Sequence, residues 1–110
     1  MSAGLLAHNV YFLLKDRSDA AVDHLLAACK KYLTVQPGIL FFACGKLVKE
    51  LDREVNDQAW DVGLHIIFKD KASHDAYQED ETHYLFINEN KANWANVRVF
   101  DSLAESQKTA

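Results

Sequence analysis

The chain has 110 residues, of which 49% are hydrophobic and 25% charged, and its formal net charge at pH 7 is −4. These values are typical of one folded domain, which we place at residues 1–110, and not of a disordered chain. The acidic balance disfavours nucleic acid as a partner, since nucleic-acid binding usually requires a basic face. No apolar run approaches the roughly 20 residues that cross a bilayer, so we expect no membrane partner.

The first elements we expect are a strand at residues 8–15 and a helix at residues 19–33. The strand is rich in aromatic and aliphatic side chains. Ser18 can cap the helix, and apolar residues recur behind it at helical spacing. Pro37 and Gly38 then break the backbone hydrogen bonding and allow a turn.

The second strand covers residues 39–44 and continues toward residue 48, and the third covers residues 60–68, with an exposed loop at residues 50–58 between them. Asp70 can cap a helix at residues 71–78. A break at residues 79–82, a short helix at residues 83–87, a fourth strand at residues 96–100 and a polar, frayed tail at residues 102–110 complete the chain. The β-α-β-β-α-β order predicts a ferredoxin-like α+β fold, an antiparallel sheet with its helices on one face and a core at about residues 8–101.

Both faces of the expected sheet are apolar, whereas helices on one face should leave the other polar. In the second strand we expect Ile39, Phe41 and Ala43 on one face, opposite three further apolar residues. The uncovered face would also carry Tyr11, Leu13, Ile67 and Phe100. So large an exposed patch predicts a homodimer in which two sheets close an α/β barrel. The alternative is that loops or the tail cover this face, but the tail is too polar for that.

The remaining polar residues suggest neither a metal nor a cofactor. Cys29 and Cys44 lie outside any CxxC motif, and the beginning of the chain lacks the features of a secretion signal, so we expect reduced thiols and a cytoplasmic location. The histidines show no HxxxH or HExxH spacing. We expect His24 and His74 to be solvated helix positions and Asp101 to have a structural role.

Several motifs occur in a recognisable order: His8-x-Val10-x-Phe12-x-Leu14-Lys15, Pro37-Gly38-Ile39, Gly45, Trp60-Asp61-Val62, Phe68-Lys69-Asp70, Tyr77, His83, Phe86 and Val99-Phe100-Asp101. Together they resemble the stress-responsive dimeric α/β-barrel family, called Dabb, along nearly the whole chain. The resemblance is more specific for fold than for activity. The family commonly has His-Pro between the tyrosine and the second histidine, where this chain has Glu79-Asp80-Glu81-Thr82, an acidic loop that would change access to a nearby pocket.

One branch of the family, the polyketide cyclases of the olivetolic acid cyclase type, closes a ring by aldol chemistry with a tyrosine and histidines. The resemblance therefore implies His83 as a base that takes a proton next to a carbonyl. It implies Tyr77 as a hydrogen-bond donor to the enolate oxygen, and His8 as a third member. The cyclases have a histidine where Val62 stands and a tyrosine where Cys29 stands, which weakens the transfer of that activity.

The same resemblance implies a pocket for a small apolar or aromatic ligand, lined by Leu26, Leu64, Phe86, Trp94, Val97 and Val99. Each candidate also has a plainer interpretation. The lining residues and Tyr77 would be ordinary core, His83 a helix cap or a core hydrogen-bonding group, and His8 an exposed residue at the start of a strand.

Three functions therefore stay open. The chain is a binder or enzyme for a polyketide-like compound, a non-enzymatic stress or assembly protein, or a small cofactor-independent monooxygenase-like enzyme. A cavity that reaches solvent beside His83 and Tyr77 would favour the first, and an interior filled by side chains would favour the second.

Overall fold

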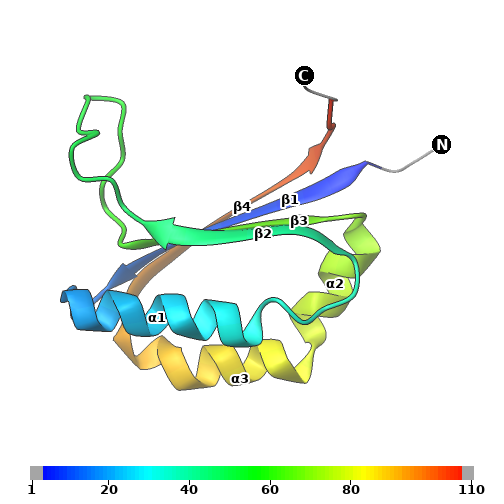
Figure 1. Ribbon diagram of the computed structural model, residues 1–110, viewed down its shortest axis with the longest axis horizontal. Helices are drawn as coiled ribbons and strands as arrows, with labels where there is room; N and C mark the ends of the chain where they lie inside the picture. The colour runs from blue at the N-terminus through cyan, green and yellow to red at the C-terminus, as the bar shows by residue number, and fades with distance from the viewer. Residues whose placement is uncertain (1–3, 108–110) are drawn as a thin grey trace.

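The computed structural model describes residues 4–107 and shows an antiparallel sheet with its helices packed on one side (Figure 1). The elements are β1 (Leu5–Leu14), α1 (Asp19–Tyr32), β2 (Ile39–Lys46), β3 (Val62–Phe68), α2 (Lys71–Glu79), α3 (Glu81–Asn90), η1 (Lys91–Asn93) and β4 (Trp94–Ala104). The strand order is β2-β3-β1-β4, and all neighbouring pairs are antiparallel. This is the predicted ferredoxin-like α+β fold.

Polar side chains determine where the helices begin. Ser18 caps α1 and Asp70 caps α2, each by accepting a hydrogen bond from a backbone N–H three residues later, as predicted. Asp80 both ends α2 and caps α3 by accepting from the N–H of Thr82. The expected break at residues 79–82 is therefore confined to this one residue, and α3 begins two residues earlier than predicted.

β1 begins three residues earlier than predicted, and β4 extends beyond both of its predicted ends, because the two strands pair with each other. Leu5 lies opposite Ala104, and Ala7 lies opposite Ser102. The prediction of a frayed tail from residue 102 was therefore wrong for residues 102–104. Residues 108–110 of that tail lie outside the described residues.

An irregularity in β2 changes which of its residues face the helices. Its pairing with β3 shifts between Ile39 and Phe41, so that Leu40 is the extra residue of a bulge. Ile39 and Phe42 consequently pack against the core, whereas Phe41 lies on the other face opposite Ile67. The prediction that Ile39 and Phe41 share a face was wrong, because a bulge interrupts the alternation.

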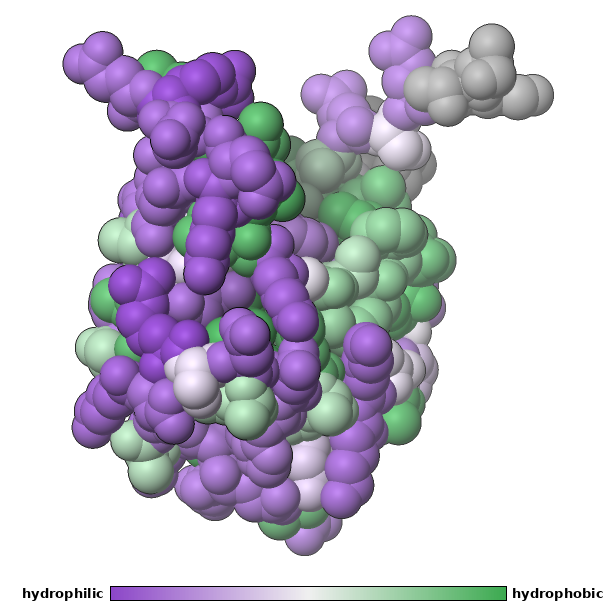
Figure 2. Space-filling model, turned by 60° about the vertical axis from the view of Figure 1, so that its left-hand side comes forward, coloured by the Kyte–Doolittle hydropathy of each residue, from purple (hydrophilic) through white to green (hydrophobic). Residues whose placement is uncertain are grey.

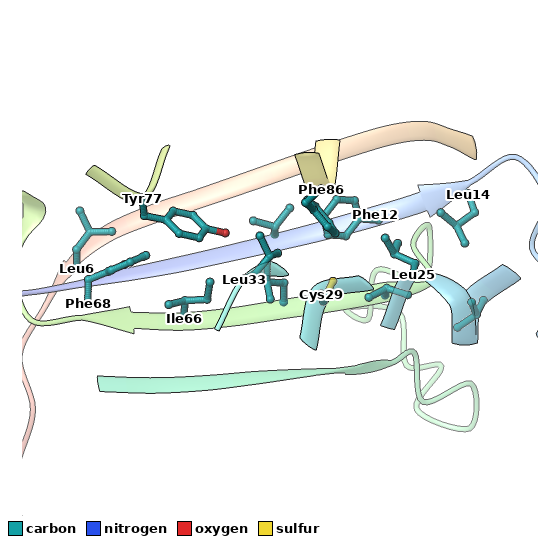
Figure 3. Packing of buried hydrophobic residues seen from close by; sticks show 14 residues of the cluster. Leu6, Phe12, Leu14, Leu25, Cys29, Leu33, Ile66, Phe68, Tyr77 and Phe86 are labelled. Atoms are coloured by element: carbon teal, nitrogen blue, oxygen red, sulfur yellow. The ribbon is translucent and has the colours of Figure 1, made fainter. Parts of the chain in front are cut away.

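The core lies between the sheet and the helices, and Figure 3 shows its side chains converging from both layers. Its buried members are Leu6, Val10, Phe12, Leu14, Val22, Leu25, Cys29, Leu33, Val62, Leu64, Ile66, Phe68, Tyr77 and Phe86. Cys29 and Cys44 are free thiols, and burial raises the pKa of Cys29 to about 12. Within residues 4–107, every helix is too short or too polar to cross a bilayer.

The opposite face of the sheet carries exposed apolar side chains. Phe41 is 57% exposed and Phe100 is 55% exposed, and strand alternation puts both on this face together with Tyr11 and Ile67. Figure 2 shows hydrophobic side chains gathered in a continuous area over the sheet, between the protruding loop and the chain ends. We call this the outer sheet face.

Candidate active site

A pocket of about 410 Å³ lies between the helix-facing side of the sheet and the helices α2 and α3. Its volume is within the range of small-molecule sites. Val97 and Val99 of the edge strand β4 line it and are 36% and 50% exposed, so the pocket reaches the surface. The lining consists of His8, Val10, Phe12, Leu33, Leu64, His74, Tyr77, Gln78, His83, Phe86, Ile87, Trp94, Val97, Val99 and Asp101.

Tyr77 and His83 are brought together by the tight junction at Asp80, which reverses the chain between α2 and α3. Their ring centroids lie 4.8 Å apart. Tyr77 is 1% exposed, and Figure 3 shows its hydroxyl oxygen directed along the core. Burial raises the pKa of Tyr77, so the hydroxyl stays protonated at neutral pH and is available as a donor.

The Nδ1 atom of His83 is buried and has no hydrogen-bond partner within residues 4–107. Most buried polar atoms in proteins are paired, so an unpaired one in a pocket requires an explanation. The helix-cap interpretation of His83 was wrong, since Asp80 takes that role one turn earlier. The arrangement instead leaves an imidazole nitrogen free to interact with a bound molecule.

Burial lowers the pKa of His83 below its ordinary value of 6.5, and the nearby ring of His8 acts in the same direction. A hydrogen bond between the ring and the backbone of Gln78 raises the pKa, and so does the negative charge of the Asp80 carboxylate. The lowered pKa means that His83 is neutral at pH 7, so that one of its ring nitrogens carries a free lone pair. His83 therefore meets the chemical requirement for a proton acceptor.

His8 is 3% exposed and faces the helices, so the interpretation of His8 as an exposed strand start was wrong. It lies opposite Asp101 in the β1–β4 pairing, and its Nδ1 is 2.5 Å from Oδ1 of Asp101. Burial lowers the pKa of His8, while the hydrogen bond and charge of Asp101 oppose that shift. Asp101 thus orients a histidine of the pocket, which goes beyond the structural role expected for it.

His74 also belongs to the pocket. Its side chain is only 14% exposed, and its ring centroid is 5.0 Å from that of His8. The expectation of a solvated helix position was wrong, because α2 packs this face of the helix onto β1 and β3. The rings of His74, His8, Tyr77 and His83 form a continuous row, with His8 and Tyr77 5.8 Å apart.

Of the six residues expected to line the pocket, Leu64, Phe86, Trp94, Val97 and Val99 do so. Leu26 lies outside the lining and packs against the core, while Leu33, beyond the last residue of α1, contributes in its place. The indole Nε1 of Trp94 is, like Nδ1 of His83, buried without a partner within residues 4–107. It is a second buried polar atom without a partner among the described residues of the pocket lining.

Several pocket residues that the sequence analysis missed carried a usable signal. His74 precedes Tyr77 by three residues on one helix, and such residues share a face. Asp101 follows Val99 by two residues on one strand, so both point to the same side of the sheet. Ile87 carried the same signal, because it follows the candidate His83 by four residues on α3, and Gln78 follows His74 by four residues on α2.

The structure is similar to solved proteins of the same fold. A Dabb family protein with a ferredoxin-like fold from Mesorhizobium loti has a TM-score of 0.76 at 20% identity, covering 94% of this chain and 99% of its own. A dimeric ferredoxin-like protein of unknown function from Jannaschia sp. CCS1 has 0.72 at 24% identity, covering 90% and 98%. The hydroxynitrile lyase from Passiflora edulis has 0.74 at 15% identity, covering 96% and 98%.

At these identities the similarity establishes the fold alone. No curated protein matches the sequence. The family model of the stress responsive A/B barrel domain, Dabb, matches residues 6–104. Because this match covers nearly all of the chain and agrees with the observed fold, the protein belongs to the stress responsive A/B barrel domain family.

Proposed function

We propose that the protein binds a small apolar or aromatic carbonyl compound in this pocket and takes a proton from the carbon next to the carbonyl group. The observation that carries this proposal is Nδ1 of His83, which is buried, has no partner among residues 4–107 and lies in an open pocket beside the ring of Tyr77. An interior filled by side chains would have favoured a non-enzymatic role, and a pocket of about 410 Å³ argues against it.

In the proposed reaction the neutral imidazole of His83 accepts the proton as the C–H bond breaks. The electron pair of that bond moves into the enolate, whose oxygen accepts a hydrogen bond from the hydroxyl of Tyr77. The enolate carbon then attacks a second carbonyl of the same molecule and forms a C–C bond. The resulting alkoxide takes the proton back from His83, so the cyclisation consumes no other reactant.

His8 would serve this reaction as a positioning group, since it lies between Asp101 and Tyr77. The apolar walls formed by Phe86 and Trp94 would hold the hydrocarbon part of the compound and exclude water. Val62 and Cys29 are fully buried core residues outside the lining, so the two departures from the cyclases leave this row of rings intact. The hydroxynitrile lyase neighbour shows that enzymes occur on this fold.

Acetophenone is a suitable probe, because it is a small aromatic ketone with exchangeable protons next to its carbonyl. We expect EDTA-treated protein in D₂O to speed loss of its methyl proton NMR signal, and His83→Leu to lose about 10²-fold or more of that acceleration. Tyr77→Phe should also lose it, whereas His24→Gln, an exposed position on α1, should keep it. Equal acceleration of the exchange by the parent and by His83→Leu would refute the proposal. If the parent does not bind acetophenone at all, the result would favour the stress or assembly role.

We further propose that the protein acts as a homodimer whose two outer sheet faces pack together, as the dimeric description of one relative suggests. The exposed rings of Phe41 and Phe100 support this, because an apolar area of this kind is normally covered. Phe100→Glu should shift the protein toward monomer in sedimentation, while Leu85→Glu on α3 should not. A parent chain that sediments at 12.5 kDa at micromolar concentration would contradict the dimer.

The two free thiols are consistent with a cytoplasmic location, which we propose on that ground alone.

A further inference from the structure

Three potential metal ligands from separate elements meet at one end of the pocket: His8 of β1, His74 of α2 and Asp101 of β4. One ligand atom of each lies within 4.8 Å of the other two. We infer that these three side chains form a binding site for a divalent transition metal ion, with Zn²⁺ as the ion that suits them best. This site does not depend on the proton transfer proposed for His83.

The distances are near those that a bound ion would require. Two ligand atoms held about 2.1 Å from one zinc ion in tetrahedral geometry lie about 3.4 Å apart. In the structure, Oδ1 of Asp101 is 2.5 Å from Nδ1 of His8 and 3.9 Å from Nε2 of His74. These separations lie on either side of the required value, so modest side-chain rotations would suffice.

The hydrogen-bonding pattern leaves room for the ion. The 3.9 Å separation between His74 Nε2 and Asp101 is too long for a hydrogen bond. Nε2 of His74 instead lies 3.5 Å from the side-chain nitrogen of Gln78, a contact at the limit of a hydrogen bond that an ion could replace. The contact between His8 and Asp101 is held by one proton, which a metal ion would replace. Nδ1 of His74 is 3.1 Å from Oδ1 of Asp75, the outer carboxylate contact that commonly orients a metal-bound histidine.

The charges also match a divalent cation. Each of the two histidines can offer a ring nitrogen to a cation, and neutral imidazole is the form that binds metals. Asp101 supplies one negative charge, and its side chain is 41% exposed, so an ion can enter from solvent. Two nitrogen ligands disfavour Mg²⁺ and Ca²⁺, which prefer oxygen, and the set of two histidines and one carboxylate is typical of transition metals.

Three protein ligands leave a fourth position open, which is the arrangement of a reactive and not a purely structural zinc site. The open position would face the pocket, since all three ligands line it and His8 lies 5.8 Å from the ring of Tyr77. A carbonyl or carboxylate oxygen of a pocket ligand is the group that such an ion would bind.

The test is metal titration of EDTA-treated, desalted protein, with Zn²⁺ followed by calorimetry and Co²⁺ by its visible absorption. We expect one ion per chain, and at least tenfold weaker binding in both His74→Gln and Asp101→Asn. His24→Gln should bind as the parent does, since His24 is an exposed histidine outside the cluster. Both replacements nearly preserve side-chain size, and circular dichroism would verify that each variant is folded.

Absence of Zn²⁺ binding at 100-fold excess would overturn the inference. Binding as tight as the parent's in both cluster variants would also overturn it, because the ion would then be held by surface histidines outside the cluster. The acetophenone assay uses metal-free protein, so its result and this one are independent. Ion binding without proton exchange would support the metal site and refute the acid–base proposal. Proton exchange without ion binding would do the reverse.

Discussion

Replacing His83 by leucine should leave the protein as stable as the parent or make it more stable, although the residue is central to the proposed chemistry. A buried polar atom without a partner costs about 1–3 kcal/mol, and leucine removes Nδ1 while filling a similar volume. The lost ring contact with Tyr77 offsets about 0.5–1.5 kcal/mol of that gain. The expected change at pH 7 therefore lies between about 0.5 kcal/mol of lost stability and about 2.5 kcal/mol of added stability.

Acid should enlarge this difference. The pKa of His83 is lowered in the folded protein, so below about pH 6.5 the unfolded chain binds more protons than the folded one. The stability that depends on neutral His83 is fully present above pH 6.5 and is lost as pH falls toward the folded-state pKa. His83→Leu has no such group and should lose less stability between pH 7 and pH 5. His8 has a shift of the same sign and is present in both proteins, so its own contribution largely cancels. Removing His83 also removes its repulsion with His8, which acts in the same direction.

Urea denaturation followed by circular dichroism, at one fixed chain concentration because a dimer's stability depends on it, would measure both effects. His24→Leu is the matched control, since it removes an exposed histidine from α1 and should change stability by no more than about 0.5 kcal/mol. A His83→Leu protein that is less stable than the parent by more than about 1 kcal/mol at pH 7 would refute this account of His83.

Three further outcomes follow from the structure. Asp80→Ala should lower the free energy of unfolding by about 0.5–2 kcal/mol, because it removes the cap of α3, and thermal melts would detect this. Gly38→Ala should lower it by more than about 1 kcal/mol, because Gly38 has φ +89° and an added Cβ would clash with the side chain of Ser73; a melt equal to the parent's would contradict this. Cys29 should react with Ellman's reagent only after unfolding, because it is fully buried and its pKa is raised to about 12; rapid reaction in the native protein would show that the core opens.

Local patterns in the sequence were sufficient to predict the order of the elements. Ser18 and Asp70 mark helix starts because an N-cap acts over three residues, and strand alternation placed Val10 and Phe12 on the helix-facing side of the sheet. The apolar character of both sheet faces could also be predicted, because assigning residues to the two faces requires only the two-residue period of a strand. These features depend on neighbours within one turn or one strand.

The details that depend on distant partners were decided only by the tertiary structure. The bulge at Leu40 and the extension of β4 to Ala104 arise from pairing with other strands, which no local pattern encodes.

The candidate site divides in the same way. The resemblance to a family was enough to single out Tyr77 and His83, whereas the meeting of His8, His74 and Asp101 was not predicted. These three come from β1, α2 and β4, and they lie together only because β1 pairs with β4 and α2 packs across the sheet. Local spacing rules find metal ligands that one helix or loop presents, but a site assembled from separate elements exists only once the long-range packing has formed.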